Sequence, residues 1–419
     1  MGTVEEHPLS FGQLSVLRDA RKLDPDRGWQ ANLILRWEVP AGVTTQDVLR
    51  ALENLALKHE VLRTTYCDLD GDEPGQIVHG ENRPNLVDMS PTGAEPGPGH
   101  GLGKFVMHRT TPAEGFDLLT DFPWRALVKT HRGRPVGVEF EIHHIAADAA
   151  ASDVLHRDFL ALLAGTSLPK SIQPRDLAEE QHSMKWNKRH KASKGYLERI
   201  LRGAAELPRV PDGNAGLTTH VGTVRSQRAL AHARSTADRL GITASTVLSA
   251  AFTRTLASLL GSGLPPVYFM SSNRHLPRYK DLVASMNQWV PFLPDPAADE
   301  AFDTACLRLH GLRMAALRYS CFNPDMASAL RGELTKVLGG GLAPGVYLNH
   351  VPATDGAERA GREELDVVWR DLGYTAEPGF FCLLTELGGF TMAVRATWSG
   401  VEAGDVEGLL HGVHRALTA

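Results

Sequence analysis

The sequence predicts a mixed α+β fold, with strands and helices interspersed in both halves of the chain. Apolar and polar residues alternate over 33–39, 136–142 and 390–398, which is the pattern of half-buried strands. Apolar residues recur at helical spacing over 44–55 and 243–260, which is the pattern of packed helices. Both periods occur in each half, so we expect each half to contain strands and helices.

In the first half, the strand at 33–39 is followed by Thr44 and Asp47, whose spacing predicts a capping box at the start of a helix. The segment 89–104 is rich in Pro and Gly and predicts an exposed loop. The composition becomes polar and contains proline over 165–174, which suits a boundary between two domains. A chain of 419 residues is expected to form two domains, here 1–170 and 171–419.

In the second half, Thr243 and Gly261 bound an apolar segment, which predicts a helix with an N-cap and a glycine stop. The strand at 390–398 precedes a closing helix at 401–417. The glycine run at 339–341 lacks the Lys and Ser/Thr of a phosphate-binding loop, so we expect a flexible connection there.

Composition excludes several classes of function. Apolar content of 42% and charged content of 22% are those of a soluble globular protein, and the net charge of −5 favours neither nucleic acid nor a membrane as partner. The basic run 185–191 is interpreted as a solvated helix face. No segment has the length of a membrane span or the form of a secretory signal, and the four scattered cysteines indicate reduced thiols in the cytoplasm.

The most informative segment is 141–148, which contains two adjacent histidines and an acid, His143, His144 and Asp148. If the strand at 136–142 continues, His144 lies on its apolar face and His143 on the opposite face with the glutamates. A neutral imidazole aimed into the interior can act as a general base near neutral pH. Two alternatives stay open: the pair is structural, and Asp148 simply caps the following helix. A metal site is not expected, because no third ligand lies at a suitable spacing.

Several segments, taken in order, resemble the condensation domains of nonribosomal peptide synthetases, which are similar to chloramphenicol acetyltransferase. The family signature His-His-x-x-x-Asp-Gly is matched at His143, His144 and Asp148. The other matching segments are Leu9-Ser-Phe-Gly-Gln-Leu14, Lys58-His-Glu-Val-Leu-Arg-Thr-Thr-Tyr66, Gly115-Phe-Asp-Leu-Leu-Thr-Asp-Phe-Pro-Trp124, Ser272-Asn-Arg274 and Leu282-Val-Ala-Ser-Met-Asn-Gln-Trp-Val-Pro291.

This resemblance implies two acetyltransferase-like lobes in a V arrangement with a tunnel between them. It implies that His144 is catalytic, and that Asp148 forms a salt bridge with an arginine from the other half of the chain, Arg274 or, as second choice, Arg63. The expected partners are an acyl or peptidyl carrier protein and a small-molecule or carrier-bound acceptor. No bound cofactor is expected, since the phosphopantetheine arm of the carrier is part of the substrate.

The sequence departs from the family pattern at three places, one of which is the segment Cys321-Phe-Asn-Pro-Asp-Met326, a faint match to the family's Gln-Asp-x-Pro-Phe-Glu. Ala149 replaces the glycine after the aspartate, and Gln288-Trp289 replaces an Asn-Thr pair. Trp289 is interpreted either as a tunnel residue or as core packing. The candidates for lining the tunnel are Ala149, Ser285, Gln288, Trp289 and Asn349.

The leading hypothesis is therefore a condensation enzyme that forms an amide or ester in natural-product biosynthesis, either free-standing or excised from a larger synthetase. Two alternatives are a coenzyme-A-dependent small-molecule acyltransferase of the same fold and a non-catalytic recruitment domain. The intact His144 and Asp148 argue against recruitment alone.

Overall fold

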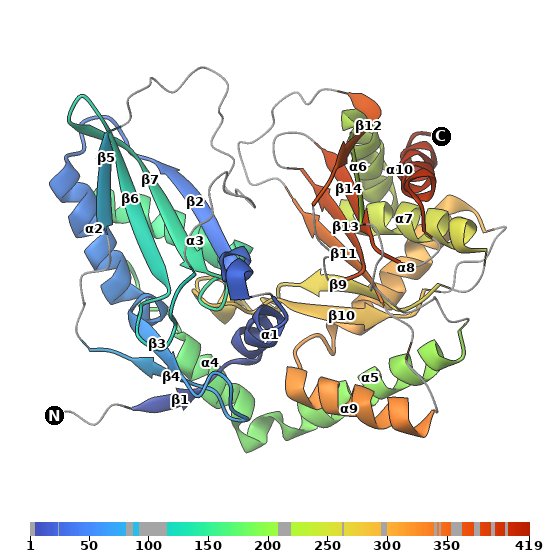
Figure 1. Ribbon diagram of the computed structural model, residues 1–419, viewed down its shortest axis with the longest axis horizontal. Coiled ribbons are helices and arrows are strands. Elements are labelled where there is room, and N and C mark those ends of the chain that lie inside the picture. The colour runs from blue at the N-terminus through green and yellow to red at the C-terminus, as the bar shows by residue number, and fades with distance from the viewer. Residues whose placement is uncertain are drawn as a thin grey trace. The chain divides into compact units, whose positions relative to one another are not determined.

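The computed structural model describes residues 5–23, 25–80, 87–91, 115–207, 219–261, 264–294, 300–338, 342, 345–352, 363–372, 378–386, 390–398 and 401–419. The chain forms two compact units (Figure 1). The first consists of Met1–His190 and Ser272–Gln288, and the second of Lys191–Ser271 and Trp289–Ala419.

The boundary differs from the expected one at residue 170. The polar segment 165–174 is a connection inside the first unit, because the helix that follows it packs against the N-terminal strand. Phe11 contacts the rings of His182, Trp186 and His190, with centroids 5.1–6.3 Å apart. These contacts hold the chain in the first unit as far as residue 190, and the later segment 272–288 returns to it.

The first unit contains two sheets. The three-stranded sheet has the order β1 (Glu6–Pro8), β4 (Gly75–Val78), β3 (Thr64–Cys67). The four-stranded sheet has the order β2 (Asn32–Glu38), β7 (Arg134–His143), β6 (Trp124–His131), β5 (Val87–Pro91). Strand β5 runs parallel to β6, and the other neighbours are antiparallel. The main helices are α1 (Phe11–Ala20), α2 (Thr45–Lys58), α3 (Ala149–Leu163) and α4 (Pro174–His182), with short 3-10 turns at Pro25–Ala31, Glu60–Arg63, Met184–Trp186 and Pro277–Tyr279.

An aromatic stack fills the core between the four-stranded sheet and its helices. The ring of Phe140 lies between Trp37 and Trp124, at centroid distances of 4.6 and 5.0 Å, and Phe159 of α3 packs on Trp37. The capping box predicted at Thr44 is confirmed at the start of α2. Of the loop expected over 89–104, residues 89–91 belong to β5, and the remainder lies outside the described residues.

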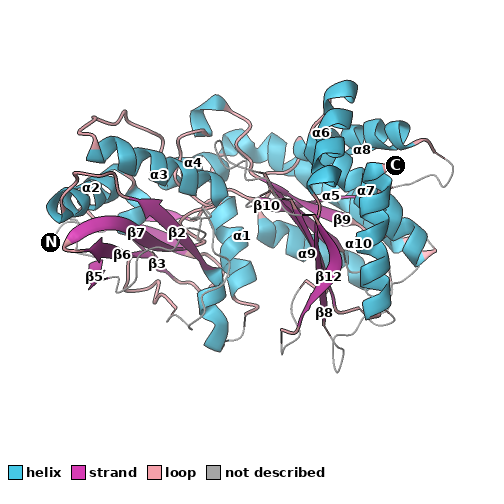
Figure 2. Ribbon diagram, turned by 90° about the horizontal axis from the view of Figure 1, so that it is seen from above, coloured by secondary structure: helices cyan, strands magenta, loops and turns pink. Residues whose placement is uncertain are grey.

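The second unit is built on one seven-stranded sheet. Its order is β10 (Gln288–Phe292), β9 (Val267–Ser271), β11 (Val346–Val351), β13 (Phe380–Thr385), β14 (Thr391–Ala396), β8 (His220–Arg225), β12 (Glu364–Arg370). Its helices are α6 (Gln227–Leu240), α7 (Ala244–Leu260), α8 (Phe302–Leu317), α9 (Pro324–Val337) and α10 (Ala403–Thr418); α5 (Asn187–Ala205) enters it from the first unit. Figure 2 shows α6, α7 and α10 on one side of this sheet.

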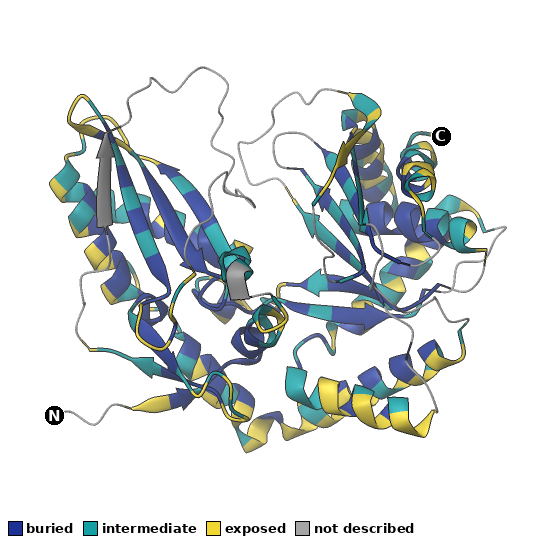
Figure 3. Ribbon diagram, in the orientation of Figure 1, coloured by how far each residue is buried: buried dark blue, intermediate teal, exposed yellow. Residues whose placement is uncertain are grey.

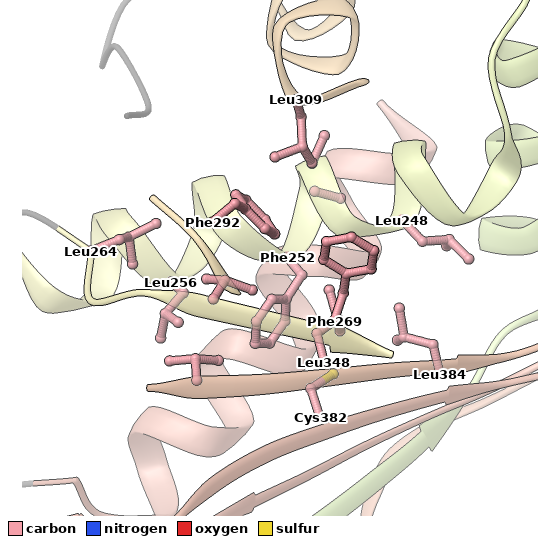
Figure 4. Packing of buried hydrophobic residues seen from close by; sticks show 14 of the residues in the cluster. Leu248, Phe252, Leu256, Leu264, Phe269, Phe292, Leu309, Leu348, Cys382 and Leu384 are labelled. Atoms are coloured by element: carbon pink, nitrogen blue, oxygen red, sulfur yellow. The ribbon is translucent and has the colours of Figure 1, made fainter. Parts of the chain in front are cut away.

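Helix α7 is the centre of the second core. Phe252 and Leu256 pack against Phe269, Leu348 and Cys382 of the sheet (Figure 4). The predicted bounds of this helix are confirmed, with Thr243 as N-cap and Gly261 in the left-handed conformation at φ 60°. The predicted strand at 390–398 and helix at 401–417 correspond to β14 and α10.

Most central strands of both units are buried, whereas the edge strand β12 is largely exposed, and many exposed positions lie on helices (Figure 3). All four cysteines are free thiols. Within the described ranges, no helix combines the length and the apolar character that crossing a membrane requires.

Candidate active site

Strand β7 carries the histidine pair to the end of the four-stranded sheet. His143 pairs in register with Asn32 of β2, and Ile142 pairs with Trp124 of β6. Ile142 is buried in the core, and His143 shares the parity of Glu141 on the opposite face, as predicted. The prediction of a half-buried strand is wrong for the second half of β7, because both of its faces are buried from residue 138 onward.

Cations allow the polar face of β7 to be buried. Glu141 is 2% exposed and accepts hydrogen bonds from Arg125 Nε at 2.7 Å and Asn32 Nδ2 at 3.0 Å. Glu139 accepts one from Lys129 Nζ at 2.9 Å. Because each buried carboxylate meets a cation, the strand that presents the histidines has no uncompensated charge at these two positions.

His143 is a structural residue of the turn. Its Nδ1 accepts a hydrogen bond from the backbone N–H of Ile145 at 3.1 Å, and its carbonyl accepts one from Ala146 at 2.9 Å. Burial, with a smaller contribution from the charge of His144, lowers the pKa of His143 to about 3. The imidazole therefore stays neutral near pH 7, and its proton lies on Nε2.

His144 is the first residue beyond the strand. The placement of His144 on the apolar face assumes that the strand continues; β7 ends at His143, and that placement stays a prediction. The backbone N–H of His144 donates to Ala31 O at 2.7 Å, which fixes the start of the turn. Its side chain is half-buried, and its Nδ1 is shielded from solvent without a hydrogen-bond partner in the described parts of the chain. Of the two imidazoles, His144 is the more exposed, and among the described residues its ring makes no hydrogen bond that holds the turn.

Asp148 serves two structural purposes at once. Its Oδ1 accepts from the N–H of Ala151 at 2.9 Å, which caps α3, and from Arg274 Nη2 at 2.8 Å. Its Oδ2 accepts from the N–H of Met286 at 3.0 Å. The carboxyl is 2% exposed and accepts three hydrogen bonds, so both interpretations made from the sequence, helix cap and ion-pair partner, are correct.

The guanidinium of Arg274 organises the loop that brings Met286 to Asp148. Its Nη1 donates to the carbonyls of Tyr279 and Leu282 at 3.0 and 2.9 Å, and its Nη2 donates to that of Ala284 at 3.0 Å. The predicted pairing of Asp148 with Arg274 is confirmed.

The second-choice partner, Arg63, lies elsewhere and contacts Glu60 and the carbonyl of His79. The expectation that the ion pair joins two lobes is wrong, because Asp148 and Arg274 belong to the same compact unit.

A glycine in α1 lets a third segment approach this loop. A Cβ added to Gly12 would lie 2.3 Å from Ser285 O and 2.5 Å from Met286 Cα, so only glycine allows this contact with the backbone. Ser10 and Gln13 form the capping box that begins α1. The segments 9–14, 143–148 and 272–288, separate in sequence, thus meet in the first unit.

Gly12 and Met286 are site residues that sequence reasoning missed. Gly12 lies inside a segment that matches the family pattern, and a glycine in the first turn of a helix was the available signal. Met286 contributes through its backbone N–H, which no side-chain motif reveals.

The five candidates for lining a tunnel fall into different environments. Ser285 and Gln288 are buried; the Ser285 hydroxyl donates to Asn287, and Gln288 accepts from Asn273 Nδ2 at 3.2 Å. Ala149 is exposed at the first position of α3.

The other two candidates belong to the sheet of the second unit. Asn349 is half-buried on β11. Trp289 is also half-buried, and its indole stands edge-on to Tyr347 and Phe381 at centroid distances of 5.0 and 6.1 Å. Tyr347 and Phe381 pair in register, so Trp289 packs against an aromatic row on this sheet. Both residues remain candidates for contact with substrate.

The chain matches a known protein family. The profile described as "Condensation domain" matches residues 6–316. Among curated proteins, the chain is 31% identical over 212 residues to the phosphinothricin tripeptide synthetase PhsC of Streptomyces viridochromogenes, covering 49% of this chain and 19% of that protein. It is 30% identical over 182 residues to the beauvericin nonribosomal cyclodepsipeptide synthetase of Gibberella fujikuroi, covering 40% of this chain and 5% of that protein. The chain thus spans less than a fifth of the length of either relative.

Solved structures show the same fold. The condensation domain from the monacolin K polyketide synthase MokA aligns with a TM-score of 0.72 and 16% identity, over 99% of this chain and 97% of that one. SgcC5 from Streptomyces globisporus aligns with a TM-score of 0.69 and 18% identity, over 98% of each chain. These alignments confirm the predicted α+β, acetyltransferase-like fold class.

Proposed function

The chain belongs to the condensation-domain family of nonribosomal peptide and polyketide synthesis, and we propose that it joins an acyl or aminoacyl thioester on a carrier protein to an amine or hydroxyl acceptor. The observation that carries the proposal is the division of roles in the segment 143–148. His143 and Asp148 accept hydrogen bonds that hold the turn and the helix start, whereas His144 is half-buried and its Nδ1 has no partner in the described structure.

In the proposed reaction, the acceptor nitrogen or oxygen attacks the thioester carbonyl. A C–N or C–O bond forms, the C–S bond breaks, and the acceptor's proton ends on the released pantetheine thiol. His144 holds or takes that proton, as a base positioned within hydrogen-bond reach does. A thioester is already activated, so much of the rate enhancement would come from placing the two reactants together. No cofactor is required beyond the phosphopantetheine arm that belongs to the donor.

The coenzyme-A-dependent acyltransferase and the recruitment domain are the two alternatives. The coenzyme-A-dependent acyltransferase is distinguished from the proposed enzyme by comparing two donors, a carrier-bound and a coenzyme-A-bound acyl group. Turnover of the acyl group on a carrier protein should exceed turnover of the same group on coenzyme A, because the proposed donor is a protein. Equal kcat/KM for both donors would favour the small-molecule acyltransferase.

Replacement of His144 tests the catalytic proposal. His144→Ala should lower kcat by about 100-fold or more, the usual contribution of a general base, with a melting temperature near that of the wild type because the ring is not used in folding. His131→Ala is the matched control, since His131 is also a half-buried histidine of the first unit. Product would be followed by mass spectrometry of loaded carrier. A folded His144→Ala protein with full activity would refute the proposal and leave recruitment as the better account.

A further inference from the structure

A strongly basic surface lies at the start of α5. Lys185, Lys188 and Arg189 are exposed, and Met184 beside them is 86% exposed. These four residues, here called the basic surface, all belong to the first unit. Figure 3 shows exposed positions along this stretch of the chain. The basic surface stands out because the chain as a whole carries a net charge of −5.

The cations of the basic surface are placed where the helix disfavours them. The first turn of α5 contains no acid, although the positive end of the helix dipole favours acids there and opposes cations such as Lys188 and Arg189. The first acid within α5 is Glu198. Within the described parts of the chain, no carboxylate forms an ion pair with Lys185, Lys188 or Arg189. A local rule broken without local compensation is a feature of functional surfaces.

Nearby carboxylates are already engaged. Glu180 accepts hydrogen bonds from Arg278, from the hydroxyl of Tyr279 at 3.2 Å and from the indole of Trp186 at 3.3 Å. Glu179 pairs with His7 at 3.0 Å. Among the described residues, neither acid forms an ion pair with a cation of the basic surface.

The fold holds part of the basic surface in place. The guanidinium of Arg189 lies 4.7 Å from the ring centroid of Trp186, a buried residue. Partial burial, and then the charge of Arg189, lower the pKa of His275 on the neighbouring loop. The charge of Arg189 is thus felt by an adjacent element, and its side chain is ordered before any partner arrives.

We propose that the basic surface is the docking site for an acidic carrier protein that delivers the thioester, an inference that rests on the proposed function. Such a carrier attaches its arm through a phosphodiester, which adds negative charge at the point of attachment. A net acidic chain repels an acidic partner over most of its surface, so a local cluster of cations would steer the encounter. Met184 supplies an adaptable apolar contact at the same place.

Binding measurements test the docking site directly. The probe is a phosphopantetheinylated, fluorescently labelled acidic carrier protein, titrated at low and moderate ionic strength. Lys185→Glu/Lys188→Glu/Arg189→Glu should raise Kd about tenfold or more at low salt, and the difference should shrink as salt screens the charges. Arg50→Glu/Arg132→Glu/Arg134→Glu makes the same change in net charge at three other exposed arginines of the first unit and should leave Kd close to the wild-type value.

Each other outcome overturns the inference. Absence of carrier binding by the wild type, an unchanged Kd in the triple variant, or equal weakening in the control variant would each do so. Binding to phosphatidylglycerol vesicles that depends on these residues, with carrier binding unaffected, would assign the surface to membranes instead. Should the triple variant melt early, Lys185→Gln/Lys188→Gln gives the same comparison with a smaller expected change.

A second readout separates this inference from the proposed function. The triple variant should turn over a short thioester of N-acetylcysteamine at the wild-type rate, because that donor has no protein to dock. His144→Ala should lose that turnover while still binding the carrier. Loss of short-thioester turnover in the triple variant would show that these cations act on something other than docking.

Discussion

Removing either member of the Asp148–Arg274 pair should destabilise the first unit strongly. The side chains are 3% and 8% exposed, and their charged atoms are 2.8 Å apart. Breaking such a pair from one side costs about 3–5 kcal/mol, because the remaining charge is left in a poorly solvated site. Asp148→Ala also removes the cap of α3 and the acceptor for Met286, while Arg274→Ala leaves three loop carbonyls without their donor. We therefore expect each single variant to fall in this range.

A double-mutant cycle measures the pairing itself. Asp148→Ala/Arg274→Ala should lose less than the sum of the single losses, with a coupling of about 1–3 kcal/mol. The assay is urea-induced unfolding followed by tryptophan fluorescence. Arg63→Ala is the matched control in the Asp148→Ala background and should be additive within about 0.5 kcal/mol, since Arg63 pairs with Glu60.

The same pair should affect the reaction through position. Asp148 holds the turn that follows His144. The two single variants and the double variant should therefore lower kcat even at temperatures where they are folded. Asp148→Glu should not restore full stability, because the longer side chain cannot keep the three hydrogen bonds in place. Strictly additive losses for Asp148 and Arg274 would refute the reasoning.

Three further predictions concern single positions. Gly12→Ala should lower the free energy of unfolding by several kcal/mol, because the new Cβ would meet a backbone atom at 2.3 Å. Gly195→Ala is the control: a Cβ there meets nothing within 4 Å and should stabilise α5 by about 0.5–1 kcal/mol. Equal melting temperatures of the two variants would contradict this. His143→Asn keeps an acceptor for the turn and should flatten the dependence of stability on pH. As pH falls from 6.5 toward 3, the free energy of unfolding of the wild type should fall by up to about 1.4 kcal/mol per pH unit, because only the unfolded chain protonates His143. Parallel plots of unfolding free energy against pH for the wild type and the variant would argue against the depressed pKa of His143. Trp289→Thr should cost about 2 kcal/mol and widen substrate tolerance; a lowered melting temperature with unchanged substrate range would restrict Trp289 to packing.

Much of the fold could be predicted from the sequence because its signals are local. The capping box at Thr44, the N-cap at Thr243 and the stop at Gly261 act within a few residues and decide where helices begin and end. The division into units could not be predicted in the same way. The segment 165–174 resembles a linker in composition, but long-range contacts of the following helix keep it inside the first unit. The composition of a segment predicts that it is exposed, but it does not predict against which of the two cores the following helix packs.

The site shows where alternation along a strand stops being informative. Parity correctly placed His143 with Glu141, because both lie within β7, and it does not decide the position of His144, because the strand ends one residue earlier. A turn follows the strand, and in it the ring of His143 accepts the N–H of Ile145. The N–H of His144 still meets Ala31, the residue next to Asn32 in the register of β2, before the chain turns. The two adjacent imidazoles have different environments: His143 is buried and accepts the N–H of Ile145, whereas His144 is half-buried and its Nδ1 has no partner among the described residues. This is why His143 and His144 should respond differently to substitution: the first in stability and its dependence on pH, the second in turnover.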